Sequence, residues 1–93
     1  MRVVLFTNEE NGTRGGNGYR DAHAQEAANH VLSVESDSGV FAPARLGFTG
    51  SEGARKLISE IGTLLAPLGM QEISGGGGGA DIGPISTLGK VPM

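Results

Sequence analysis

The chain has 93 residues, a formal net charge of −3 and no cysteine. This length allows one domain with a marginal core, because folding at this size buries only about 60 to 65 per cent of the surface that the unfolded chain exposes. The seven Lys and Arg residues are scattered and form no basic stripe, which argues against a nucleic-acid partner. No apolar run approaches the roughly 18 residues that span a bilayer, and no signal peptide is visible, so we expect a soluble chain with no membrane partner.

Two short apolar stretches in the first third of the chain predict buried strands. Residues 2–7 (RVVLFT) are continuous and rich in β-branched side chains, and residues 30–36 (HVLSVES) have the same character with more polar positions. The alanine-rich stretch between them, residues 17–29, predicts a helix of about three turns with Asn17 as its N-cap. We therefore expect a βαβ unit with parallel strands and a right-handed crossover.

The strongest helical pattern lies in the middle of the chain, after a weak, short strand predicted at residues 43–48 (PARLGF). Thr49 and Glu52 have the spacing of a capping box, and Pro67 with Gly69 ends the helix. The apolar positions recur at the spacing of one helical face. They are Ala54, Leu57, Ile58, Ile61, Leu64 and Leu65.

The last part of the chain predicts further short elements. Residues 70–74 (MQEIS) form a third strand, residues 75–79 form a loop of five glycines, and a short helix starts near Asp81. Residues 90–93 (KVPM) are typical of the start of another strand that has no room to pair. We therefore expect an α/β fold with a short, mostly parallel sheet, cut at both ends from a larger one. The alternative is that residues 90–93 are a frayed tail and Met1 is a natural start.

Three carboxylates follow the first two predicted strands. Glu9 and Glu10 come after residues 2–7, and Asp37 comes after residues 30–36. In an open α/β sheet, ligands bind at the carboxyl edge of the strands, so these side chains are candidates to share a cation. The alternative is that they are solvated loop acids, with Asp37 capping a turn.

Four segments together resemble the middle of the catalytic domain of the di-zinc exopeptidases, a family that includes carboxypeptidase Q (plasma glutamate carboxypeptidase) and bacterial leucyl aminopeptidases. They are LFTNEENGTRGG (5–16), ESDSG (35–39), FTGSEGARKLISEIGTLLAPLG (48–69) and GGGGADI (76–82). The Glu-Glu pair with the downstream Asp is the specific part. The resemblance implies part of a three-layer domain that hydrolyses terminal peptide bonds, from a secreted or periplasmic parent. Whether that parent is an aminopeptidase, a carboxypeptidase or a dipeptidase stays open.

The resemblance also implies a role for each carboxylate. Glu9 corresponds to the general base, which takes a proton from a metal-bridging water, and Glu10 and Asp37 correspond to ligands of one zinc ion each. The family's two histidine ligands and bridging aspartate come from segments before and after residues 1–93. We therefore expect a partial catalytic domain that binds zinc weakly or not at all and is inactive alone. His23 and His30 are expected to be ordinary surface or strand-edge histidines.

The glycine loop and its neighbours are candidates for substrate contact. The Gly75–Gly79 run offers backbone N–H groups to an anion, although it lacks the Lys and Ser/Thr of a P-loop. Gly78, Gly79 and Asp81 are therefore candidates for substrate binding, with an N-cap role as the alternative for Asp81. Arg14 is a further candidate, and the two glycines after it are expected to supply positive φ angles. Two other functions stay open. One is a small anion- or nucleotide-binding module, and the other is a non-catalytic fragment that self-associates through exposed sheet edges.

Overall fold

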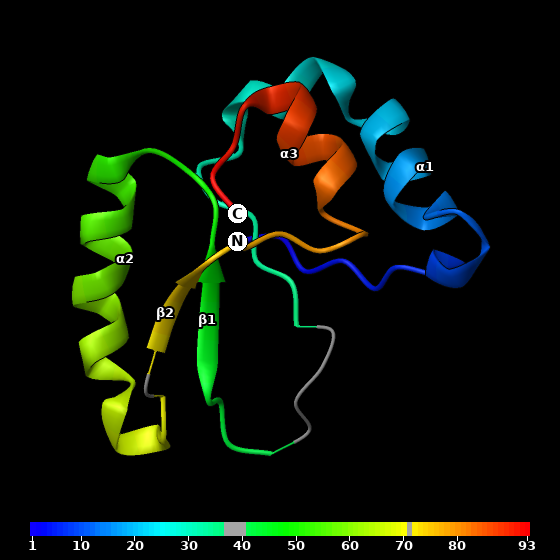
Figure 1. The fold of residues 1–93 in the computed structure, drawn as a ribbon. Coiled ribbons are helices and arrows are strands. Elements are labelled where there is room, and N and C mark those ends of the chain that lie inside the picture. Colours follow the sequence, from blue (N-terminus) through cyan, green and yellow to red (C-terminus); the bar gives the residue numbers. More distant parts are fainter. Residues whose placement is uncertain (37–40, 71) are drawn as a thin grey trace.

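The structure is a computed structural model, and it describes residues 1–36, 41–70 and 72–93. The α-helices are α1 (Arg14–Ala22), α2 (Glu52–Leu64) and α3 (Gly83–Gly89), and the strands are β1 (Arg45–Phe48) and β2 (Glu72–Gly75). The short 3₁₀ helices are η1 (Glu9–Asn11), η2 (Ala24–Asn29) and η3 (Ala66–Leu68). Within the described ranges, no helix is long and apolar enough to cross a membrane. The fold is α/β with flanking helices, as the sequence predicts (Figure 1).

The sheet consists of β1 and β2, which run parallel and place Leu46 opposite Ile73. Strand β1 lies within the predicted strand at residues 43–48, and β2 overlaps the predicted strand at residues 70–74. Helix α2 connects them and packs along the sheet (Figure 1). Gly62 makes this packing possible, because a Cβ atom there would lie 2.6 Å from Cδ1 of Ile73 and 2.9 Å from Cε of Met70. Met70 is buried at this contact, and Phe48 on β1 and Ile58 on α2 are also buried.

The predicted strands at residues 2–7 and 30–36 are wrong. In the described part of the chain, neither segment belongs to a sheet. Their backbone groups form hydrogen bonds outside any sheet. For example, the Ser33 N–H donates to the oxygen of Pro92 at 3.0 Å. Their apolar side chains are largely exposed, at 90% for Leu5 and 86% for Val31. An apolar, β-branched composition favours extended backbone, but a strand also needs a neighbouring strand to complete its hydrogen bonds.

The first helix begins earlier than its predicted cap. Helix α1 starts at Arg14 with Thr13 at the N-cap position, so the prediction of Asn17 as N-cap is wrong. Asn17 lies within α1, and its side-chain amide donates to Oγ1 of Thr13 at 3.0 Å and to the Gly12 oxygen at 3.3 Å. Beyond the break at His23, the predicted helix continues as η2.

The second helix is capped by a different residue from the one predicted. Oγ of Ser51 accepts the Ala54 N–H at 3.2 Å, so the capping box at Thr49 is wrong. Thr49 instead exchanges two backbone hydrogen bonds with Met93, at 2.7 and 2.8 Å. Residues 90–93 are therefore held in place without forming a strand, and Val91 is buried.

A second core lies where α3 packs against α1 and η2 (Figure 1). Ala27, Ile82, Ile85 and Val91 are buried there. The backbones come close at Gly89, where a Cβ atom would overlap the main-chain oxygen of Ala27. The glycine loop, residues 76–79, joins this second core to the sheet.

Candidate functional site

The two adjacent glutamates lie in η1, a single turn between residues 1–8 and α1. The Thr13 N–H donates to the Glu9 oxygen at 2.8 Å, and the Arg14 N–H donates to the Asn8 oxygen at 3.2 Å. The Glu9 side chain is half-buried, whereas that of Glu10 is exposed. The turn therefore holds both carboxylates on a backbone that is fixed at each end.

The backbone on either side of the glutamates has positive φ angles, and it is strained at Thr13. Asn8, Gly12 and Thr13 have φ angles of 61°, 88° and 52°, all in the left-handed region. Glycine adopts this region freely and asparagine tolerates it, but a β-branched threonine does so at a cost of about 1 to 3 kcal/mol. Such strain is concentrated at active sites and ligand sites. The positive φ angle of Thr13 is thus a reason, separate from sequence resemblance, to consider this turn as a candidate site.

The glycines after Arg14 serve close packing and do not supply positive φ angles. Both lie inside α1. A Cβ atom on Gly15 would lie 2.5 Å from the Thr7 oxygen, and one on Gly16 would lie 2.5 Å from the Asp81 oxygen. The start of α1 therefore lies directly against the backbone at Asp81.

Asp81 is the predicted substrate residue that is best enclosed. Its Oδ1 atom is buried and, among the described residues, has no hydrogen-bond partner. It does not cap α3, because Ile82 occupies the N-cap position and no side chain caps that helix. A half-buried carboxylate from Glu35 accepts the N–H groups of Asp81 at 3.2 Å and Ile82 at 3.0 Å.

The remaining predicted residues have different surroundings. Arg14 is the exposed first residue of α1. Gly78 has a φ of +111° and lies against Sδ of Met93, and Gly79 lies against Glu35. Asp37 lies outside the described residues. Sequence reasoning missed Glu35, although it lies in the ESDSG segment that carries the resemblance.

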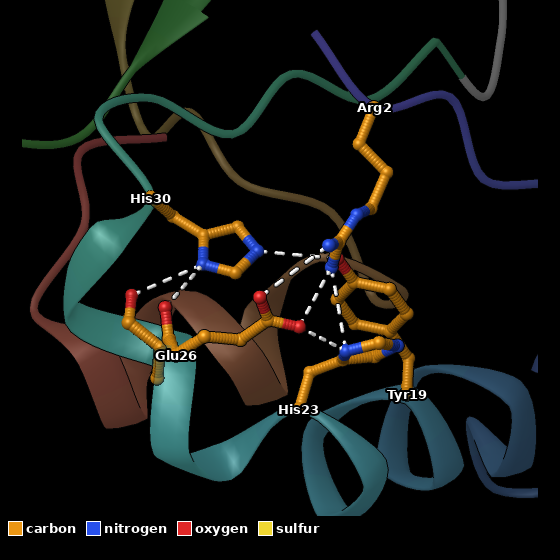
Figure 2. A network of polar contacts seen from close by, with 6 residues as sticks. Arg2, Tyr19, His23, Glu26 and His30 are labelled. Atoms are coloured by element: carbon orange, nitrogen blue, oxygen red, sulfur yellow. Dashed lines mark hydrogen bonds and ion pairs between the residues drawn. The ribbon is translucent and has the colours of Figure 1, made fainter.

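A polar network between α1, η2 and the start of the chain was also missed (Figure 2). The Arg2 guanidinium donates to the Tyr19 hydroxyl at 2.9 Å and to Glu26 Oε1 at 3.1 Å. His23 contacts Glu26, and Nε2 of His30 lies 3.1 Å from the Tyr19 hydroxyl. Both histidines are therefore engaged in this network. A cavity of about 590 Å³ lies beside it, lined mainly by residues 1–6 and 29–34.

Charge pairing explains the pKa shifts in the network. The hydrogen bond from Arg2 lowers the pKa of Glu26 below its usual value of 4.5, and His23 lowers it further. The hydrogen bonds to Glu26 and Tyr19 raise the pKa of Arg2 above its ordinary range. Glu26 therefore remains ionised throughout the neutral range.

No complete metal site is present in the part of the chain that the structure describes. Within residues 1–36, 41–70 and 72–93, no three His, Asp or Glu side chains are grouped so that they could hold a metal ion. A catalytic zinc ion usually has about three protein ligands. Glu10 and Asp37 would need further ligands from elsewhere.

Comparison with known proteins gives clear relatives. No protein-family model matches the chain. Human carboxypeptidase Q is 43% identical over 82 residues, which are 88% of this chain. Carboxypeptidase Q from Bos taurus is 40% identical and that from Xenopus laevis 37% identical over 82 residues each. The chain is related to carboxypeptidase Q.

A solved structure supports the same relationship. The peptidase M28 precursor from Shewanella amazonensis SB2B matches with a TM-score of 0.84 and 30% identity over 97% of this chain. The predicted resemblance to exopeptidases of the carboxypeptidase Q type is thereby confirmed, together with the α/β fold. The chain spans 17% of human carboxypeptidase Q and 20% of the bacterial peptidase chain.

Proposed function

We propose that residues 1–93 are part of the catalytic domain of a zinc-dependent exopeptidase, with Glu9 as general base and Glu10 and Asp37 as ligands of one zinc ion each. The observation that carries this proposal is the strained, hydrogen-bonded turn that holds Glu9 and Glu10 side by side. The relationship to carboxypeptidase Q and to a peptidase M28 precursor supports it.

The geometry of η1 suits two adjacent glutamates with different roles. A 3₁₀ helix has three residues per turn, so successive side chains diverge by about 120°. One carboxylate can therefore bind a metal ion while its neighbour faces the substrate. The exposed side chain of Glu10 suits the ligand. The half-buried side chain of Glu9 suits a base, because partial burial keeps a carboxylate in one position.

The donors in this chain fit part of a di-zinc site. Carboxylate oxygens are accepted zinc ligands, and Glu10 and Asp37 would supply one to each ion. Two zinc ions, when bound, would make a water molecule more acidic and polarise the scissile carbonyl. Glu9 would then accept the proton of the attacking water and pass it to the leaving amine. The other ligands would come from segments that the longer relatives possess.

The same proposal covers the substrates and the location of the whole protein. Its substrates would be peptides that lose a terminal residue, by an aminopeptidase, carboxypeptidase or dipeptidase reaction, and its location would be outside the cytoplasm. In this proposal, Arg14, Gly78, Gly79 and Asp81 would contact the substrate. The anion-module alternative is less well supported, because two of the loop glycines, Gly77 and Gly79, lie in close contact with other parts of the chain. Gly77 lies against the Gly47 oxygen, where a side chain would overlap it.

The decisive experiment uses an extended protein, in which residues 1–93 are joined to the flanking segments of a carboxypeptidase Q relative. Zinc content and peptide hydrolysis are measured for the parent, Glu9→Gln, Glu10→Gln and Asp37→Asn. We expect Glu9→Gln to keep both zinc ions and lose activity, and each ligand variant to lose one zinc ion. Glu60→Gln, an exposed position on α2, is the matched control. An Asp37→Asn variant with two zinc ions and full activity would show that Asp37 is a turn residue.

A further inference from the structure

A single oxygen of Glu35 receives two backbone hydrogen bonds from a distant part of the chain. Oε2 accepts the N–H of Asp81 at 3.2 Å and that of Ile82 at 3.0 Å, across 46 and 47 residues of sequence. Charged acceptors form stronger hydrogen bonds than neutral ones, and a half-buried position protects these from competing water. The contact therefore joins residues 34–36 to the turn before α3.

The glycine loop is shaped around this carboxylate. A Cβ atom at Gly79 would overlap the carboxyl carbon and both carboxyl oxygens of Glu35. At Gly75, in the same glycine run, a Cβ atom would meet nothing within 4 Å. The absence of a side chain at Gly79 thus has a specific reason, which is the space that Glu35 occupies.

The opposite side of the Asp81 backbone contacts the helix that follows the glutamate turn. A Cβ atom on Gly16 would lie 2.5 Å from the Asp81 oxygen, so α1 rests on that peptide group. A cavity of about 270 Å³ lies between residues 4–6, residues 34–36 and residues 81–82. Asp81 therefore has its N–H bound by Glu35 and its carbonyl covered by α1. The buried Oδ1 atom of Asp81, which has no hydrogen-bond partner among the described residues, lies in the same region.

We propose that Glu35 is a positioning residue, which holds the Asp81 backbone as an anchor for α1 and so for the Glu9–Glu10 turn that precedes this helix. Gly16 places the glutamate turn against the same anchor. This inference rests on the proposed function for its link to catalysis, whereas the contact itself is testable alone.

The contact is tested first in the 93-residue chain by amide hydrogen exchange. Glu35→Ala should raise the exchange rates of the Asp81 and Ile82 amides about tenfold or more, the effect of losing a charge-assisted bond. Glu35→Gln keeps an acceptor oxygen and should restore much of the protection. Glu60→Ala is the control and should leave both rates unchanged. Equal rates in Glu35→Ala and the parent would overturn the proposal.

A double-mutant cycle keeps the test decisive even if Glu35→Ala is unstable. Gly79→Ala should lower the melting temperature when Glu35 is present, and should lower it much less in a Glu35→Ala background, because the overlap is then gone. Gly75→Ala is the matched control and should have the same effect in both backgrounds. A Gly79→Ala effect that is equal in both backgrounds would overturn the contact.

The link to catalysis is tested in the extended protein loaded with cobalt, whose visible spectrum reports the geometry of its ligands. Glu35→Ala should change the spectrum and lower kcat more than it raises KM, and Glu35→Gln should largely restore both. If the Glu9 and Glu10 variants behave as proposed while Glu35→Ala keeps the parent spectrum and kcat, the positioning role is wrong. If the Glu9 and Glu10 variants have no effect, the proposed function fails. The hydrogen-exchange rates and the double-mutant cycle still decide whether the contact between Glu35 and Asp81 exists.

Discussion

The guanidinium of Arg2 faces both carboxylate oxygens of Glu26, with Nη1 at 3.1 Å from Oε1 and Nη2 at 3.4 Å from Oε2 (Figure 2). This two-point pair ties the beginning of the chain to η2. The same guanidinium donates to the Tyr19 hydroxyl on α1. Residues 1–8, which lack a strand partner in the described part of the chain, are thus held by side chains at this point.

The first prediction concerns the pH dependence of stability. Since Arg2 and His23 lower the pKa of Glu26 in the folded chain, the unfolded chain binds a proton there more readily. The stabilisation is therefore present above the usual pKa of 4.5 and is lost as pH falls through the lower folded value. Both side chains are solvent-exposed, so we expect a small effect. The melting temperature of the parent should fall more than that of Glu26→Gln between pH 6 and pH 3.

The second prediction concerns packing at the start of α1. Gly16→Ala should destabilise the chain by about 1 to 3 kcal/mol, because its methyl group would press on the main-chain oxygen of Asp81. Gly18→Ala is the matched control in the same helix, where a Cβ atom meets nothing within 4 Å. It should stabilise the chain by about 0.5 to 1 kcal/mol, since alanine favours helix. Urea titration compares the two. A neutral Gly16→Ala would contradict the close approach of α1 to Asp81.

The third prediction concerns activity of the chain alone. We expect the 93-residue chain to hydrolyse no aminoacyl or dipeptide substrate above background, because the described residues hold no group of three metal ligands. Release of products from a panel of peptides, with zinc added, measures this. Turnover that disappears in Glu9→Gln would show that the chain completes its site in another way.

The fourth prediction concerns self-association. Val3, Leu5 and Val31 are 75%, 90% and 86% exposed on the segments that form no strand in the described part of the chain. Such exposed apolar side chains favour contact with another surface, so we expect dimers or larger species in light scattering. Leu5→Ser should shift the population toward monomer. Leu88→Ser, at a site 50% exposed on α3, should do so less. A monomeric parent with a cooperative melt would favour a self-sufficient module.

Local sequence determined the elements whose partners lie close along the chain. The apolar spacing from Ala54 to Leu65 predicts α2 because a helix completes its hydrogen bonds within itself. Strands β1 and β2 were also near their predicted places, since α2 brings them together. The Glu9–Glu10 pair became a specific candidate only through the family resemblance, together with the downstream Asp37, because two acids after a strand are a weak signal by themselves.

Tertiary structure decided everything that depends on distant partners. Residues 2–7 have the composition of a strand, but a strand also needs a neighbouring strand whose backbone completes its hydrogen bonds. No described strand lies beside them. Thr49 has the spacing of a cap, but its backbone N–H and C=O groups form hydrogen bonds with Met93, and Ser51 caps α2 instead. The contact between Glu35 and Asp81 joins positions 46 residues apart. No local pattern encodes such a contact, because it arises only when the folded chain brings a charge and two free N–H groups to the same place.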